Sequence, residues 1–315
     1  MTQYIARRLL LMIPVLIGVS VVVFGLARIL PGDVFTAQSA NSGIDKPTQD
    51  KLRKEAGLDR PLPVQYFEWA SHAAIGDFGD SLYNRQNVAD QIKKAAPVTF
   101  ELTLLGTAIG LLIAIPAGVI SAVTRGSPID FLVRFGAVIG LSVPSYVLGA
   151  LTIAYLSLWF NWIPPSGYRS IFENPWQNAQ QFFFPALILG SSFSASVMRM
   201  TRSTVLGVLR EDYIRTARAK GLETRVVVIT HVLRNSLLPV LTLVGTQVGF
   251  LLGGSVIVET IFSLNGIGFI GFAAVQNRDY IMIQAITLLA ALVFTGLNLL
   301  VDLSYAWLDP RIRLR

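Results

Sequence analysis

The chain alternates between long apolar runs and shorter polar segments. Six of the runs are close to the roughly 20 residues that a helix needs to cross the hydrocarbon core of a bilayer. These runs are Leu9–Leu30, Leu102–Val123, Leu132–Leu158, Phe182–Met198, Leu237–Val258 and Ile283–Tyr305. Because a backbone inside a bilayer must satisfy its own hydrogen bonds, the pattern predicts an all-α polytopic membrane protein with six transmembrane helices.

The polar segments divide the chain into four predicted parts. The first is an N-terminal transmembrane helix over residues 1–30, interpreted as an uncleaved anchor because its apolar run is long for a signal peptide. An extracytoplasmic loop or small cap follows over residues 31–96. Residues 97–306 form a transmembrane core that contains a long inner loop at 199–236. Residues 307–315 form a cytoplasmic tail.

Prolines and glycines inside the runs predict bends and close helix packing. Pro116 and Pro144 fall within predicted spans, where each indicates either a static kink or a moving joint. Seven glycines favour close approach between helices. They are Gly106, Gly110, Gly136, Gly140, Gly249, Gly253 and Gly254.

Composition and charge agree with a membrane protein. Hydrophobic residues make up 53% of the chain and charged residues 14%, whereas soluble domains carry about 25% charged residues. The net charge of +7 would suit nucleic acid if the chain were soluble. The basic residues instead gather at both termini and in the second and fourth loops, as expected for cytoplasmic parts. We therefore predict that both termini are cytoplasmic, with lipid as a partner and no nucleic acid.

The sequence contains no recognisable catalytic or metal-binding pattern. It has no cysteine, and its two histidines, His72 and His231, lie far apart. The ATP-binding pattern G-x-x-x-x-G-K-[ST] is absent, as are the hydrolase patterns H-E-x-x-H and G-x-S-x-G. We predict no catalytic, cofactor-binding or metal-binding residue in this chain.

Charged residues within the predicted spans lie near the span ends. They are Arg28, Glu101, Glu259 and Asp302. Ionisable groups deep in a span mark proton and ion pathways, so this placement argues against a proton-coupled carrier. We interpret Asp302 as interfacial. Glu259 is expected either at the interface or in contact with a partner subunit.

The predicted outer loop contains two short helical patterns. Lys51–Ala56 predicts a helix ended by Gly57, and Val64–Ile75 has aromatic residues near helical spacing. These segments predict a small cap or a set of interfacial helices. Their aromatic side chains either lie among lipid headgroups or help to dock an external partner.

The inner loop carries a more specific pattern, from Glu211 to Pro239. Its first part predicts a short helix with Glu211 and Asp212 at the start and basic residues near the end, as the helix dipole favours. Gly221 is placed to terminate this helix. Tyr213, Ala217 and Gly221 share one stripe, whose small residues predict a shallow surface that another protein can approach. A solvated positive loop would explain the charges but not this order.

Six short segments, in order along nearly the whole chain, carry a family resemblance. They are RILPGD at Arg28–Asp33, DYIRTARAKGL at Asp212–Leu222, HVLRNSLLPV at His231–Val240, ETIFSLNGIG at Glu259–Gly268, NRDY at Asn277–Tyr280 and LDPRIR at Leu308–Arg313. Together they resemble the B-type permease subunit of the dipeptide, oligopeptide and nickel group of ABC importers. The broader importer pattern has E-A-A where this chain has Arg215, Thr216 and Ala217, a departure that suits the peptide and nickel branch.

The resemblance implies a type I ABC importer permease fold and a coupling helix in the inner loop. That helix would dock in a groove of a cytoplasmic ATPase subunit. Its implied docking residues are Tyr213, Arg215, Thr216, Ala217, Arg218, Ala219, Lys220, Gly221 and Leu222. Ala217, Ala219 and Gly221 would permit close approach, and the basic residues would make polar contacts.

The resemblance also implies partners, location and mechanism. A related C-type permease, two ABC ATPases that bind ATP and Mg²⁺, and an extracytoplasmic solute-binding protein would complete the importer. It would lie in a bacterial or archaeal cytoplasmic membrane. Di- or oligopeptides, nickel or a related small solute would cross by alternating access, between the two permeases and near the third to fifth spans.

Two other functions stay open at this point. A secondary transporter or channel would move solute without an ATPase. An intramembrane enzyme would need a paired catalytic constellation, for which the sequence offers no candidate.

Overall fold

The computed structural model describes residues 2–29, 35, 45–55, 57–165 and 167–308. Helices form nearly all the regular structure in these ranges, where the β contact is an isolated bridge between Asp80 and Asn87. The chain divides into two compact units. Met1–Val98 with Asn265–Gly296 forms one, here called the cap unit, and Thr99–Leu264 with Leu297–Leu314 forms the other, here called the core unit.

The cap unit begins with the long helix α1 (Thr2–Ile29) and contains the short helices α3 (Lys46–Glu55) and α4 (Leu62–Ala74). The first turns of α5 (Val88–Val123), all of α12 (Ile267–Gln276) and the first part of α13 (Tyr280–Leu308) complete it. The two short helices predicted in the outer loop are confirmed as α3 and α4, although α3 begins earlier. The apolar helix α12 was not predicted.

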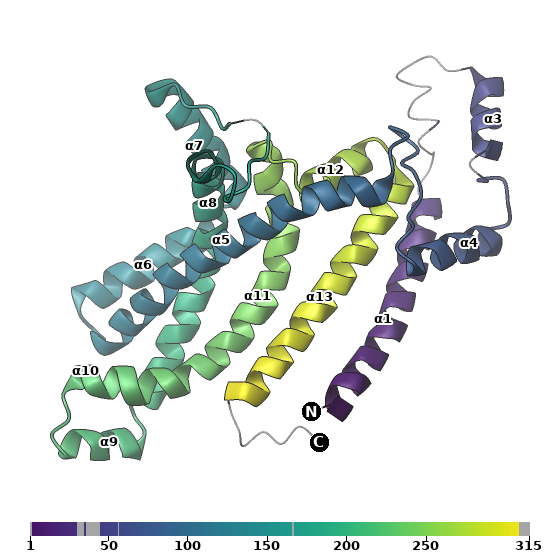
Figure 1. The fold of residues 1–315 in the computed structure, drawn as a ribbon. Helices are drawn as coiled ribbons and strands as arrows, with labels where there is room; N and C mark the ends of the chain where they lie inside the picture. The colour runs from purple at the N-terminus through teal and green to yellow at the C-terminus, as the bar shows by residue number, and fades with distance from the viewer. Residues whose placement is uncertain (1, 30–34, 36–44, 56, 166, 309–315) are drawn as a thin grey trace. The chain divides into compact units, whose positions relative to one another are not determined.

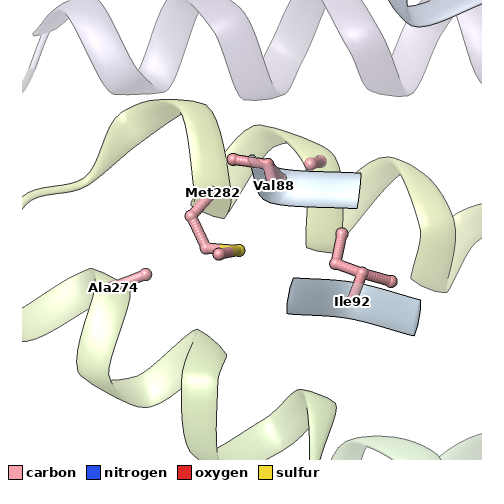
Figure 2. Packing of buried hydrophobic residues seen from close by; sticks show 5 residues of the cluster. Val88, Ile92, Ala274 and Met282 are labelled. Atoms are coloured by element: carbon pink, nitrogen blue, oxygen red, sulfur yellow. The ribbon is translucent and has the colours of Figure 1, made fainter. Parts of the chain in front are cut away.

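The start of α5 and the consecutive helices α12 and α13 build the core of the cap unit. Val88 and Ile92 of α5 pack with Ala274 of α12 and with Met282 and Ala285 of α13 (Figure 2). Beside them Ser81 donates a buried hydrogen bond to the carboxylate of Asp279. Burial raises the pKa of the Asp279 carboxyl group above its usual value.

Aromatic contacts attach α4 to α1 within the cap unit. The Phe24 ring meets the Tyr66 ring edge-on at 5.4 Å between centroids and lies 6.0 Å from the Trp69 ring. The Tyr66 hydroxyl also lies 2.9 Å from the Ser20 hydroxyl, within hydrogen-bond distance. Such edge-on ring pairs contribute more stabilising free energy than the burial of their surface alone.

The core unit holds the remaining helices, and Figure 1 labels the α-helices among them. After α5 come α6 (Pro128–Ser142), α7 (Ser145–Phe160) and the long α8 (Pro175–Val208), which packs against α6, α7 and α11. The inner segment comprises α9 (Asp212–Ala219), α10 (Thr224–Val226) and the π-helix η1 (Val227–Val232). It leads into α11 (Leu233–Ile261).

The predicted spans correspond to observed helices, with one difference. Five helices in the described ranges are long and apolar enough to cross a membrane, and the sixth predicted span, Leu132–Leu158, is a pair, α6 and α7, bent by 93°. Pro144 causes the break, because the residue before a proline avoids helical geometry. Val143 accordingly has extended geometry, with φ of −90° and ψ of 116°. Pro116, by contrast, lies within the continuous helix α5.

Glycines bring α5 and α8 close together in the core unit. A Cβ atom added at Gly190 of α8 would lie 2.6 Å from the carbonyl oxygen of Gly106 on α5. Gly110 and Gly118 likewise leave no room for a side chain against α8. The packing role predicted for Gly106 and Gly110 is therefore confirmed. Gly136, Gly253 and Gly254 have nothing within 4 Å of such a Cβ atom, so they do not serve packing among the described residues.

The predicted inner loop, 199–236, contains the ends of two long helices. Helix α8 continues through Arg199 to Val208, and α10, η1 and α11 form one helical stretch from Thr224 to Ile261. Residues 209–223 alone connect these long helices. Parts of the RILPGD and LDPRIR motifs, and the predicted tail after Leu308, lie outside the described residues.

Candidate functional site

Helix α9 is the predicted inner-loop helix, and the structure confirms it. It lies in the connection between α8 and α10, at the bottom of the view in Figure 1. Glu211 precedes it with extended geometry, Asp212 occupies its first turn and Arg218 its last turn. These charges match the positive start and negative end of the helix dipole.

One buried side chain anchors α9 to the rest of the core unit. Ile214 is fully buried among Ala122 of α5, Val205 of α8, and two valines of η1, Val227 and Val232. In a π-helix the hydrogen bond joins residues five apart, so Val227 and Val232 lie on nearly the same side and both reach Ile214. Burying an isoleucine side chain contributes about 1.5–3 kcal/mol. This single contact therefore fixes which face of α9 points inward.

The opposite face of α9 is exposed. The predicted docking residues divide as follows: Tyr213, Arg215, Thr216, Arg218, Ala219, Lys220, Gly221 and Leu222 are exposed, whereas Ala217 is half-buried. Ala217 packs against the cluster around Ile214, so its small size serves packing within this chain. Ala219 is the small residue on the open face. Arg215 pairs with Asp212 at 3.2 Å on the surface.

The end of α9 is a Schellman turn built on Gly221. The amide of Leu222 donates to the carbonyl of Ala217 at 3.4 Å, and the amide of Gly221 donates to that of Arg218 at 2.9 Å. Gly221 has a φ of +82°, which side chains other than glycine rarely adopt. A Cβ atom there would meet nothing within 4 Å. Backbone conformation, rather than contact within this chain, explains the glycine.

A hydrogen bond also links α9 to the start of α11. The side-chain amide of Asn235 donates to the Tyr213 hydroxyl at 2.8 Å. Together with the Ile214 cluster, this bond connects α9 to α5, α8, η1 and α11. A force on α9 would therefore reach several long helices of the core unit.

A buried polar network near the start of α6 was not foreseen from the sequence. Arg202 of α8 donates to both carboxylate oxygens of Asp130 at 3.0 and 3.1 Å, and also to the Ser121 hydroxyl of α5. The side chain of Asp130 is almost fully buried, and Arg134 approaches it at 3.2 Å. In the sequence these charges resemble ordinary cytoplasmic loop charges. The i,i+4 spacing of Asp130 and Arg134 was the available signal.

Two carboxylates predicted near span ends lie in polar clusters of the core unit. Glu259 is fully buried and accepts hydrogen bonds from Thr99 at 2.8 Å and Ser255 at 3.0 Å. The alternative that it contacts a partner subunit was therefore wrong, because helix packing encloses it. Glu101 accepts hydrogen bonds from Tyr168 and Asn178. Burial and this bond to Glu101 raise the pKa of the Tyr168 hydroxyl above its usual value.

A cavity of about 190 Å³ lies among α7, α8 and α11 of the core unit. Its polar lining residues are Ser145, Ser192 and Gln247, and Phe193 and Phe250 supply apolar walls. The described residues contain no group of three or more His, Asp or Glu side chains able to hold a metal ion. The lining is thus mixed, with neutral polar groups among apolar side chains and no charged side chain.

Comparison with known proteins identifies close relatives. The chain is 41% identical over 313 residues, 99% of both chains, to the glutathione transport system permease protein GsiC of Escherichia coli strain K12. GsiC proteins of Shigella dysenteriae serotype 1 and Shigella flexneri serotype 5b match with the same identity and coverage. These relatives are permease subunits of transport systems.

Solved structures share the fold. An inward-facing form of the MetNI methionine ABC transporter matches with a TM-score of 0.56 and 18% identity, over 70% of this chain and 96% of that chain. An amino acid ABC transporter determined with histidines matches with a TM-score of 0.52 and 18% identity, over 68% of this chain and 92% of that chain. The fold is that of type I ABC importer permeases.

Family models account for nearly the whole length. Residues 1–103 match the N-terminal part of the membrane component of binding-protein-dependent transport systems, and residues 114–314 match the inner membrane component itself. A transport subunit of this kind is not itself an enzyme, and it is a multi-pass protein of the inner membrane. The chain belongs to the family of binding-protein-dependent transport system inner membrane components, as an ABC importer permease of the peptide and nickel group.

Proposed function

We propose that this chain is one of two related permeases in an importer of short peptides, driven by ATPases that dock on α9. The second permease is of the C-type, two ATPase subunits bind ATP and Mg²⁺ on the cytoplasmic side, and a solute-binding protein delivers the solute outside. Both termini of this chain are cytoplasmic. Solute crosses by alternating access between the two permeases.

The arrangement of α9 is the observation that best supports this proposal. Its inner face is fixed by Ile214 to helices α5, α8 and η1, and its outer face presents Thr216 and Ala219 to solvent. A short helix with one anchored face and one open, small-residue face suits insertion into a groove of another protein. Movement of that partner would then be passed to the long helices as a rigid-body shift, one of the usual forms of switching transition.

The uncharged cavity among α7, α8 and α11 supports a solute pathway near the third to fifth spans. Ser145 and Ser192 offer hydroxyl groups there, and Gln247 offers an amide. Neutral hydrogen-bonding groups suit the amides of a peptide, and they pose no strong electrostatic barrier to its charged ends. The break between α6 and α7 at Pro144 adjoins this cavity, which Ser145 lines, and it would serve as a hinge during alternating access.

Short peptides are the favoured solute class. The GsiC relatives are named for glutathione, itself a small peptide, and they align over 99% of this chain. Nickel complexes are the second candidate, since the family resemblance covers both classes. The binding protein is expected to contribute much of the selectivity between them.

Reconstituted transport tests the proposal. The complete importer in proteoliposomes should take up radiolabelled Ala-Ala only with ATP present and with the binding protein outside. Importers with ATPase-dead partner subunits should not. Peptide uptake by this chain without any ATPase would instead indicate a secondary transporter or channel. ATP-dependent uptake of nickel but not of any tested peptide would exclude the peptide assignment.

A further inference from the structure

The cap unit contains a cavity of about 410 Å³, within the size range of ligand sites in proteins. Buried side chains form its inner part, among them Gln65, Leu82 and Gln284. Exposed charged residues form its mouth. The cavity lies within the cap unit and is separate from the core-unit cavity among α7, α8 and α11.

Three polar side-chain atoms along this cavity lack hydrogen-bond partners in the described structure. They are Oε1 of Gln65, Nε1 of Trp69 and Nε2 of Gln284. Gln65 and Gln284 are 8% and 3% exposed. Buried polar groups in native proteins are almost always hydrogen-bonded, because leaving one unpaired costs free energy. Three such atoms on one cavity indicate that a ligand completes their bonding.

The orientation of the Gln65 amide is set by its neighbours. Its nitrogen donates to the carbonyl oxygens of Leu58 at 3.3 Å and Arg60 at 2.7 Å. Both amide hydrogens are thus committed, which leaves Oε1 as an acceptor. The Trp69 indole is a donor only. The cavity therefore offers an acceptor at Gln65 and donors at Trp69 and at Nε2 of Gln284.

An amide group of a ligand matches this set of atoms. Its carbonyl oxygen can accept from Trp69 and Gln284, while its N–H donates to Gln65. Water could bond to these atoms one at a time, whereas a single amide group carries both the acceptor and the donor that they require. The inner lining therefore favours a small molecule that contains an amide.

The mouth of the cavity carries charges of both signs. The arginines and carboxylates of its lining are Arg28, Arg60, Glu55, Glu68 and Asp77, and Arg60 pairs with Glu68 at 2.7 Å. A purely anionic ligand would be repelled by three carboxylates, and a purely cationic ligand could not pair with Arg60. A zwitterion can place its ammonium group and its carboxylate group against opposite charges. Mixed charge at the mouth and amide-matching atoms within indicate the same ligand class.

We propose that this cap-unit cavity binds a short zwitterionic peptide, with a peptide amide held by Gln65, Trp69 and Gln284 and the charged ends at the mouth. The site is additional to the transport pathway and needs neither the ATPases nor the binding protein. It shares only the solute class with the proposed function, so the two can fail independently.

Ligand-observed NMR on the full-length chain in nanodiscs tests the site, with Ala-Ala as the probe. We expect saturable binding to the unaltered chain. Gln284→Leu and Trp69→Phe each remove one donor and keep the side-chain bulk, and each should weaken binding by about tenfold or more. Gln276→Leu, the same change at an exposed position of α12, is the matched control and should leave binding unchanged. Thermal unfolding of each variant reports whether it is folded.

Two analogues separate a peptide from other ligands. Alanyl-lactate replaces the peptide N–H with an ester oxygen, which would face the acceptor of Gln65, so its binding should also be about tenfold weaker or more. Glycerophosphoethanolamine represents a lipid headgroup and should displace Ala-Ala only weakly. No saturable binding to the unaltered chain, equal affinity across the folded variants, or stronger binding of the headgroup analogue would overturn the inference. Ala-Ala uptake by the complete importer would still test the proposed function separately.

Discussion

Helices α9 and α4 are both short and lie outside the long apolar helices, yet they use their faces in opposite ways. Helix α9 buries the apolar Ile214 completely and exposes charged and small residues. Helix α4 buries the polar Gln65 and exposes the large apolar residues Leu62, Val64 and Phe67. The first arrangement suits contact with a water-soluble partner. The second suits contact with lipid on one side and a polar ligand on the other.

The anchors of the two helices differ as well. Helix α9 depends on aliphatic packing around Ile214, which reaches three other helical segments of the core unit. Helix α4 is held to α1 by the rings of Phe24, Tyr66 and Trp69. A pattern of charges alone would make α9 look like an ordinary positive loop. One buried isoleucine distinguishes a surface with a defined orientation from a solvated loop.

The largest expected effect comes from removing the anchor of α9. Ile214→Ala should destabilise the inner segment by about 2–5 kcal/mol, because the cavity left behind adds to the lost burial. Hydrogen exchange in residues 209–223 should rise, and the ATPases should no longer co-purify. Phe67→Ala, which alters an exposed residue of α4, should leave both readouts unchanged. Equal loss of ATPase binding in both variants would contradict the assignment of ATPase docking to α9 and not to α4.

A bulky residue on the open face of α9 should have the next largest effect. Ala219→Trp should reduce ATPase association by about tenfold or more, since the side chain would occupy the space of the partner. The inner segment should keep its normal hydrogen exchange, because Ala219 is exposed. Ala74→Trp, at an exposed position of α4, is the matched control. Undiminished association of the Ala219 variant with the ATPases would show that this face is not part of the docking surface.

The turn at Gly221 should respond more moderately. Gly221→Ala places a side chain at a φ of +82°, at a cost of about 1–2 kcal/mol. We expect a fewfold loss of ATP-driven uptake, without loss of membrane insertion. Gly207→Ala, in the last turn of α8 with open space around it, should be neutral or slightly stabilising. A larger loss of ATP-driven uptake in Gly207→Ala than in Gly221→Ala would show that the turn is not constrained in the assembled importer.

The smallest effect is expected at Tyr213. Tyr213→Phe removes the hydroxyl that accepts a hydrogen bond from Asn235, and both residues are exposed. The inner segment should lose about 1 kcal/mol or less of stability. This loss should be visible as slightly faster hydrogen exchange at the start of α9, with nearly normal uptake. An effect as large as that of Ile214→Ala would mean that the hydrogen bond, and not apolar packing, holds the helix.

The long helices could be predicted from sequence because their signals are local. Twenty apolar residues define a span wherever they occur, and Gly221 marks a helix end by its own backbone freedom. The exact shape of the third span could not be read so simply. Pro144 allowed either a kink or a joint, and the 93° bend depends on how α6 and α7 pack onto α8.

The sites were harder to foresee because they depend on contacts between distant segments. Asp130 and Arg202 lie 72 residues apart, and their charges resembled ordinary cytoplasmic loop charges. Glu259 is enclosed by Thr99, 160 residues away. Helical spacing predicted one shallow surface of Tyr213, Ala217 and Gly221, but in the fold Ala217 packs against the cluster around Ile214. Ala219 could not be distinguished from Ala217 on sequence alone.

Site-specific crosslinking at Ala219 tests the central claim most directly. The chain has no cysteine, so Ala219→Cys introduces a single reactive thiol. In the assembled and transporting importer, this thiol should be shielded from a water-soluble maleimide and should crosslink to an ATPase subunit carrying a bifunctional reagent. Full maleimide labelling of Cys at this position in a complex that still hydrolyses ATP and imports solute would contradict the account.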